Sequence, residues 1–262
     1  DSDAEMGDDS DYEDDEDGDY DDYDDFGGDD DDNTWKVRRA SVKVIQAFIV
    51  SRPELLQQLY NQCTDSLVGR LKEREESVKT SIIVCLEELM KTTALRRTAG
   101  SRADGVVALL EGKKDAIVNV ICRLLKDKKT SVKVKTALFA LFSHFMNALD
   151  LSSPAAEAAA GGAAPSPGIS AHFDMLVPLL ATALRDRDGN LKLQVLQFLQ
   201  MVLESHTTAA VTPHATALIP AVIACASEDW YKIIAQSLRV ISAFVSVLRP
   251  ITTDAGGRSF LA

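Results

Sequence analysis

The sequence HFDMLVP at residues 172–178 recurs 42 residues later as HATALIP at residues 214–220. His, Leu and Pro occupy the same places in both copies, so the chain contains an internal repeat. A second signature follows each copy: an apolar residue and a lysine open a stretch of regularly spaced apolar positions. Outward from these copies, the apolar–lysine pair occurs five times, at Trp35-Lys36, Val78-Lys79, Val132-Lys133, Leu191-Lys192 and Tyr231-Lys232.

The spacing of these pairs indicates the fold class. The five lysines are 43, 54, 59 and 40 residues apart. Apolar residues follow them every three or four positions, which places these residues on one face of a helix; examples are Val78, Ile82, Leu86 and Leu89. Further helical stretches precede the pairs, near residues 55–71 and 116–125, so the unit is helix A, a short polar turn and helix B. A period of about 40–45 residues is typical of HEAT repeats. We therefore predict an all-α HEAT-repeat solenoid, in which stacked antiparallel helix pairs form one continuous core.

The boundaries of the array follow from the same pattern. We expect about four and a half repeats over residues 33–250, because no helix A precedes Trp35-Lys36. Polar, Gly- and Pro-containing composition predicts insertions at residues 96–115 and 152–170, each between a helix B and the next helix A. Residues 251–262 are interpreted as the truncated start of another repeat, and the chain as an internal piece of a longer solenoid. Pro178 and Pro220 fall within helix A, where proline kinks a helix.

The net charge of −12 is unevenly distributed. Residues 1–32 hold 20 Asp and Glu and no Lys or Arg, whereas residues 33–262 hold 20 acidic and 28 basic residues. So many like charges with few aliphatic residues do not form a core, and we expect residues 1–32 to be disordered. Two roles for this segment stay open: binding of a basic partner, or solubilisation.

The five repeated lysines are the candidate site residues. A lysine in the first turn of a helix gains nothing from the helix dipole, so its recurrence implies another partner. Our main interpretation is an internal polar ladder, in which each lysine meets an acidic or carbonyl group in the preceding turn of the same or the adjacent repeat; the alternative is direct contact with a ligand. The candidate partners are Asp32, Glu75, Asp127, Asp186 and Asp229.

No catalytic or metal-binding motif is found. The sequence has no HExxH, GxSxG or P-loop pattern, and its four histidines lack metal-ligand spacing. The four cysteines lie in apolar stretches without a CxxC pair, which predicts reduced core cysteines in a cytoplasmic or nuclear protein. We therefore expect no enzyme, cofactor, metal or small-molecule substrate. No run of 18 uncharged apolar residues occurs, so no membrane span is expected. The basic segment KVRR at residues 36–39 is interpreted as a solvated helix face and not as a nucleic-acid site.

Several stretches resemble one known family. They are the acidic run ending in DDNTWKVRRA at residues 31–40, SRPELL at 51–56, LKEREESVK at 71–79, YKI at 231–233 and LRP at 248–250. Together they resemble the cullin-associated and neddylation-dissociated proteins, which are HEAT solenoids; the insertion at 152–170 departs from that pattern. The resemblance implies a scaffold that wraps the un-neddylated cullin and its RING subunit and promotes exchange of substrate-receptor modules. No motif marks the residues that contact the partner.

A second function class stays open beside this one. A HEAT-type nuclear transport receptor, or another HEAT scaffold, would use the acidic segment to bind basic partners.

Overall fold

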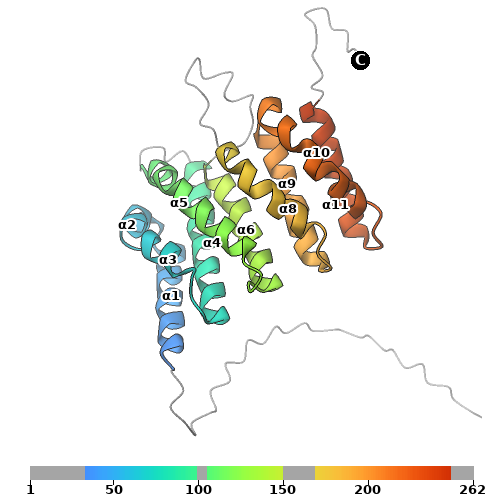
Figure 1. Cartoon of the computed structure of the whole chain (residues 1–262). Coiled ribbons are helices and arrows are strands. Elements are labelled where there is room, and N and C mark those ends of the chain that lie inside the picture. The colour runs from blue at the N-terminus through green and yellow to red at the C-terminus, as the bar shows by residue number, and fades with distance from the viewer. Residues whose placement is uncertain (1–32, 99–104, 150–168, 249–262) are drawn as a thin grey trace, which may run out of the picture. The chain divides into compact units, whose positions relative to one another are not determined.

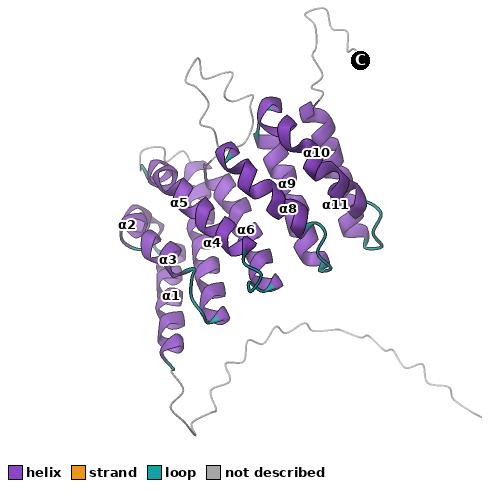
Figure 2. Cartoon of the chain, viewed as in Figure 1, coloured by secondary structure: helices purple, strands orange, loops and turns teal. Residues whose placement is uncertain are grey.

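The computed structural model describes residues 33–98, 105–149 and 169–248. Within these ranges the chain forms helices and turns and no β-strand (Figure 2). The fold class predicted from the sequence is confirmed. The expected disorder of residues 1–32 and the expected truncated repeat at 251–262 lie outside the described residues.

The helices form two layers, which we call the A layer and the B layer (Figure 1). In the B layer, neighbouring helices pack against one another in chain order: α1 (Thr34–Ser51), α4 (Glu76–Thr98), α6 (Val132–Leu149), α9 (Gly189–Ser205) and α11 (Tyr231–Leu248). The A layer holds η1 (Pro53–Leu55), α2 (Leu56–Gln62), α3 (Thr64–Arg70), α5 (Val106–Lys126), η3 (Ser170–His172), α8 (Phe173–Ala183) and α10 (Thr208–Cys225). In the described part of the chain, α1 is therefore followed by four pairs of helix A and helix B.

The apolar faces read from the sequence face the core. In α4 the side chains of Val78, Ile82, Leu86 and Leu89 are each 1% exposed. Between α6 and α9, the Phe198 ring packs against Phe139 and Phe142, with centroid distances of 6.0 and 5.2 Å. Buried side chains from α1 to α11 belong to one apolar cluster, as expected when neither helix of a pair can bury its stripe alone.

The turn between α8 and α9 shows how one repeat is closed locally. Asp186 Oδ1 accepts the backbone N–H of Asp188 at 3.0 Å, and Asp188 Oδ1 accepts the N–H of Leu191 at 2.8 Å. Asp188 is the N-cap of α9, where a short acidic side chain satisfies an amide that has no partner inside the helix. The polar turn predicted between helix A and helix B is thus held by its own aspartates.

The predicted insertion at residues 96–115 is wrong at both ends. α4 continues to Thr98 and α5 already begins at Val106, so Gly105 and residues 99–104, which lie outside the described residues, are all that separates the two helices. The reason is that Val106, Leu110 and Ile117 share one helix face and are 6%, 0% and 1% exposed. Burial of this face outweighs the polar and glycine content of the segment.

Two further details depart from the sequence reading. The first described helix A is divided, because α2 ends at Gln62 and α3 begins at Thr64. The second insertion, predicted over 152–170, ends earlier: Ile169 is 0% exposed and Ser170 begins η3, while residues 152–168 lie outside the described residues. Pro178 and Pro220 lie inside α8 and α10, as the repeat alignment predicted.

Candidate protein-binding surface

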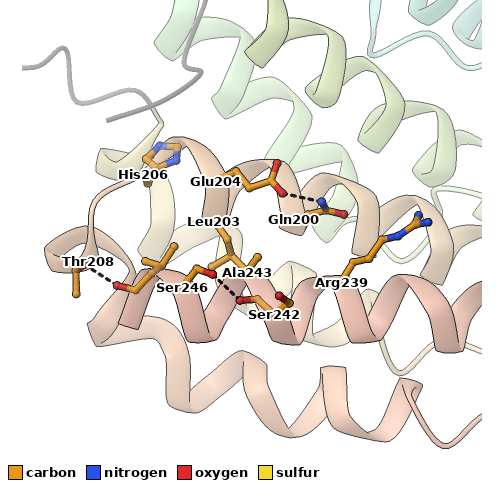
Figure 3. A pocket seen from close by; sticks show the side chains of 10 residues that line it. Gln200, Leu203, Glu204, His206, Thr208, Arg239, Ser242, Ala243 and Ser246 are labelled. Atoms are coloured by element: carbon orange, nitrogen blue, oxygen red, sulfur yellow. Dashed lines mark hydrogen bonds between the residues drawn. The ribbon is translucent and has the colours of Figure 1, made fainter. Parts of the chain in front are cut away.

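An open groove of about 510 Å³ lies between α9 and α11 of the B layer (Figure 3). Leu203 and Ala243 contribute buried apolar surface, whereas Glu204, Ser242 and Ser246 are exposed. Amide, hydroxyl and charged groups beside apolar surface suit contact with a polypeptide. The remaining lining residues are Gln200, His206, Thr208, Arg239 and Val247.

A chain of hydrogen bonds joins the two helices along this groove. Arg239 Nη1 donates to Gln236 Oε1 at 3.2 Å, and Gln236 Nε2 donates to Gln200 Oε1 at 2.7 Å. Gln200 Nε2 then donates to Glu204 Oε1 at 2.6 Å, as Figure 3 shows. Gln236 is 4% exposed, so its position is fixed by packing. The groove therefore presents a guanidinium and a carboxylate that are held in a defined register between two repeats.

His206 lies at one end of the groove and has a structural environment. Its Nδ1 lies 2.8 Å from the Val202 carbonyl oxygen; because a carbonyl only accepts, Nδ1 carries the proton in that contact. Ser205 Oγ, 3.1 Å from Nδ1, donates to the Met201 carbonyl oxygen at 2.7 Å. The ring packs on Phe173 with a centroid distance of 4.9 Å. Ser205 and His206 therefore do not form a nucleophile and general-base pair.

A second group of ionisable side chains lies on α4 and α6. Lys91 Nζ bonds Glu88 Oε1 at 2.9 Å. Burial raises the pKa of Glu87, and the nearby Lys91 opposes this shift. Burial lowers the pKa of His144, and Lys91 lowers that pKa further. These ionisable side chains are half-buried on the B layer.

The A layer carries a row of contacts between a basic side chain and an aspartate of successive repeats, which we call the helix-A ladder. In each pair, a base on one helix A meets an aspartate of the preceding repeat. In two of the repeats, the base is followed two residues later by the aspartate that contacts the base of the next repeat: Asp115 follows Lys113, and Asp174 follows His172. The pairs are Lys113 Nζ to Asp65 Oδ1 at 2.5 Å, His172 Nε2 to Asp115 Oδ1 at 3.0 Å, and His214 Nε2 to Asp174 Oδ1 at 4.0 Å.

Comparison with known proteins shows which proteins the chain resembles. Residues 168–260 match the family described as CAND1-like, TPR repeats. The chain is 32% identical over 240 residues to Cullin-associated NEDD8-dissociated protein 1 of Drosophila melanogaster, covering 88% of this chain and 18% of that protein. The protein of the same name from Arabidopsis thaliana is 33% identical over 229 residues, covering 86% and 17%. Cullin-associated NEDD8-dissociated protein 2 of Mus musculus is 30% identical over 233 residues, covering 85% and 17%. Over most of its length the chain is similar to the cullin-associated NEDD8-dissociated proteins.

The resemblance identified in the sequence is thereby confirmed. The chain spans less than a fifth of the length of these cullin-associated NEDD8-dissociated relatives. The matched family is described by TPR repeats, which have a period of about 34 residues. His172 and His214 are 42 residues apart in this chain. This offset lies in the range of HEAT repeats.

Among the residues that the structure describes, the candidate lysines make no ion pair with the upstream carboxylates Glu75, Asp127, Asp186 and Asp229. Within the described ranges, Lys192 alone among them makes an ion pair, and its partner is Glu228 of the following repeat, not Asp186. Lys36 and Lys232 lie over the neighbouring rings of Trp35 and Trp230, at 5.8 and 5.7 Å. Lys79 is half-buried and Lys133 is exposed. The candidate Asp32 lies outside the described residues.

Two of the upstream carboxylates, Asp127 and Asp186, are engaged within their own turns. Asp127 Oδ1 accepts the backbone N–H of Lys129 at 2.9 Å, and Asp186 accepts that of Asp188 in the same way. These aspartates close their own turns. The backbone N–H of Lys79 donates to the backbone carbonyl oxygen of Glu75 at 3.0 Å, in the first turn of α4. The helix-A ladder was not predicted, although its base-x-Asp pattern is visible at residues 113–115 and 172–174.

The described residues also bear on metal binding and on membrane insertion. In the described part of the chain, no group of three His, Cys, Asp or Glu side chains could hold a metal ion. Two helices, α10 and α11, have the length and hydropathy of a membrane span. Both pack into the repeat stack, where core helices satisfy the same criterion. The expected absence of a membrane partner stays a prediction.

Proposed function

We propose that this chain is a scaffold segment that binds cullins. The observation that supports it is similarity over 85–88% of the chain to proteins named for their association with cullins. A stack of helix pairs offers a long surface with distributed contacts, which suits the binding of a large protein partner. The segment contributes binding surface and no chemical step.

The finer part of the proposal concerns the complete protein. There the segment would help to hold a cullin and its RING subunit in the un-neddylated state, and so support exchange of substrate-receptor modules. The proposed location is the cytoplasm and nucleus, where thiols stay reduced. The four cysteines, free in this structure, agree with that location.

The groove between α9 and α11 is the candidate contact within this segment. Arg239 and Glu204 are exposed at opposite ends of the hydrogen-bond chain through Gln236 and Gln200. Because the buried Gln236 positions Arg239, this guanidinium loses less conformational freedom on binding than a free surface arginine would. Arginine is also enriched among residues that dominate interface energies.

The test is direct binding of the full chain to a purified cullin–RING pair, with and without conjugated NEDD8. We expect binding to the unmodified pair and weaker binding to the conjugate. Arg239→Glu should weaken binding roughly tenfold if it lies at the interface centre. Lys114→Glu on α5 is the charge-matched control and should change affinity less than about twofold. No binding of the wild-type chain, beside a binding full-length relative, would contradict the proposal.

A further inference from the structure

Three of the four described turns that join helix A to helix B form an edge rich in basic residues; the fourth, at residues 226–230, holds Glu228 and Asp229 and no Lys or Arg. This edge consists of residues 70–79, 126–135 and 185–192, and we call it the basic edge. These three segments hold twelve Lys and Arg and six Asp and Glu. Residues 126–135 alone hold five lysines and one aspartate. In Figure 2 these turns lie along the same side of the helical stack.

The three turns are neighbours in space as well as in composition. α4, α6 and α9 pack side by side in that order, and each begins at this edge. Ser131 Oγ, just before α6, donates to Glu76 Oε1 at the start of α4 at 2.9 Å. This bond fixes the turn before α6 beside the turn before α4. The lysines of one repeat therefore add to the charge of the next.

Part of this charge has an internal explanation. Arg70 ends α3 and Lys126 ends α5, where a cation is favoured by the helix dipole. Lys192 is paired with Glu228. Glu73 accepts two bonds from Arg38, to Nε at 2.9 Å and to Nη2 at 3.3 Å. Each of these groups is satisfied within the fold.

The middle of the edge has no such explanation. Lys128, Lys129 and Lys133 are exposed, and none makes an ion pair within the part of the chain that the structure describes. The nearby Asp127 carboxylate accepts a backbone N–H of its own turn. Lys133 stands in the first turn of α6, where the helix dipole disfavours a cation. Three like charges within six residues repel one another, and a bound anion would remove that cost.

We propose that the basic edge binds an extended, acidic segment of a partner protein. Neighbouring helices are about 8–10 Å apart, and an extended chain advances about 3.3–3.6 Å per residue. A peptide with an acidic residue at every third position would therefore place one carboxylate at each turn. The inference rests on the charge and order of these turns and not on the identity of a cullin as partner.

The same observations favour a peptide over a nucleic acid. Single-stranded nucleic acids are held by base stacking on aromatic rings, and the three segments of the basic edge contain no aromatic residue. Six carboxylates interleaved with the lysines would also face a backbone that carries a negative charge at every phosphate. A peptide avoids them, because its neutral residues can lie against the carboxylates.

The experiment uses the full chain and a fluorescein-labelled 20-residue peptide of repeated Glu-Ser-Ser, followed by fluorescence anisotropy at low and physiological salt. We expect saturable binding that weakens as salt rises. Lys128→Glu with Lys129→Glu should weaken binding roughly tenfold. The control, Lys43→Glu with Lys114→Glu, makes the same change in net charge away from the edge and should weaken binding less than about twofold. Circular dichroism verifies that both variants keep their helix content.

The outcomes separate this proposal from its competitors and from the proposed function. An equal loss in both double variants would show a non-specific charge effect and overturn the proposal. So would the absence of peptide binding, or tighter binding to a 20-nucleotide RNA or to vesicles with anionic headgroups than to the peptide. Cullin binding that survives in Lys128→Glu/Lys129→Glu would leave the proposed function intact while the peptide result decides this inference.

Discussion

His172 Nε2 lies 3.0 Å from Asp115 Oδ1, although 57 residues separate them and they belong to successive repeats. The same relation joins the repeats before and after, through Lys113 to Asp65 and through His214 to Asp174. Two of the described helices A, α5 and the η3–α8 segment, thus supply both a base to the preceding repeat and an acid to the following one. A stack of similar helix pairs can slide by one helical turn without losing apolar contact, and these directional pairs oppose such a slip.

The first prediction concerns the coupling of this pair. A double-mutant cycle with Asp115→Ala and His172→Ala should give a coupling of about 0.2–1 kcal/mol, because Asp115 is exposed and such pairs are screened by water. Urea unfolding of the four proteins measures it. Additive free-energy changes would show that the pair contributes no register energy.

The second prediction contrasts two glycines in helices. A Cβ at Gly189, the first residue of α9, would lie 2.9 Å from Trp230 Cε3, whereas a Cβ at Gly112 in α5 would meet nothing within 4 Å. Gly189→Ala should therefore destabilise the protein by about 1–3 kcal/mol through overpacking. Gly112→Ala should stabilise it by about 0.5–1 kcal/mol, because alanine has the higher helix propensity.

Thermal and urea unfolding of the two variants give the signs. The same substitution is made in both, so each is the control for the other. A stabilised Gly189→Ala variant would mean that the Trp230 ring moves aside at little cost.

The sequence predicted the apolar faces well and the polar contacts poorly. Apolar spacing in α4 is a property of consecutive residues, and burial of Val78 and Ile82 follows from it. The partner of Lys192 is Glu228, 36 residues downstream in the turn of the adjacent repeat, and not the upstream candidate Asp186. In a repeat stack, a lysine can lie equally close to a carboxylate a few residues away along the chain and to a carboxylate of the next repeat. Spacing alone does not distinguish them.

Composition misled the reading of residues 96–115 in a way that spacing could have corrected. Polar residues and glycine in this stretch suggested a loop, yet Val106 and Leu110 are four residues apart and both face the core. The base-x-Asp pattern of the helix-A ladder was equally visible at residues 113–115 and 172–174. Its meaning depends on helix A of one repeat lying beside helix A of the next, which the chain order does not state.

The third prediction concerns a buried hydrogen bond between α2 and α4, the two layers of the first described helix pair. Thr93 Oγ1 donates to the Leu89 carbonyl oxygen at 2.7 Å, so in its 2.8 Å contact with Tyr60 the tyrosine hydroxyl is the donor. Thr93→Val would leave that buried hydroxyl with only the Met90 sulfur at 3.8 Å, and should cost about 1–3 kcal/mol.

Tyr60→Phe is the matched variant. It leaves Thr93 bonded to Leu89 and should cost less, about 0.5–1.5 kcal/mol. Chemical unfolding of both proteins measures the order. If Tyr60→Phe proved the more damaging change, the assignment of donor and acceptor would be wrong.

The fourth prediction concerns thiol reactivity. Cys63 is half-buried, whereas Cys85, Cys122 and Cys225 are buried. Burial raises the pKa of Cys85 to about 12 and that of Cys122 to about 11, so both stay protonated and shielded at pH 8. A maleimide reagent should modify Cys63 first and the other three only on unfolding. Peptide mass spectrometry identifies the modified site, and Cys63→Ser should abolish the fast phase. Rapid modification of Cys85 in the folded protein would contradict its burial.

The fifth prediction follows from the same pKa shifts. The pKa of the Cys85 thiol is ordinarily 9.0, and burial raises it to about 12 in the folded protein. Above pH 9 the unfolded chain therefore loses a proton that the folded chain keeps. Stability should therefore be unaffected by this group below pH 9 and should fall as the pH rises from 9 towards 12. At pH 10 the loss is on the order of 1 kcal/mol for this thiol, since one pKa unit corresponds to about 1.4 kcal/mol.

Burial raises the pKa of Cys122 to about 11 and shifts stability in the same direction, so urea unfolding between pH 8 and 10.5 should show a clear decline. Cys85→Ala lowers stability at every pH but removes its own share of the slope. An unchanged slope in that variant would assign the alkaline loss of stability to other groups.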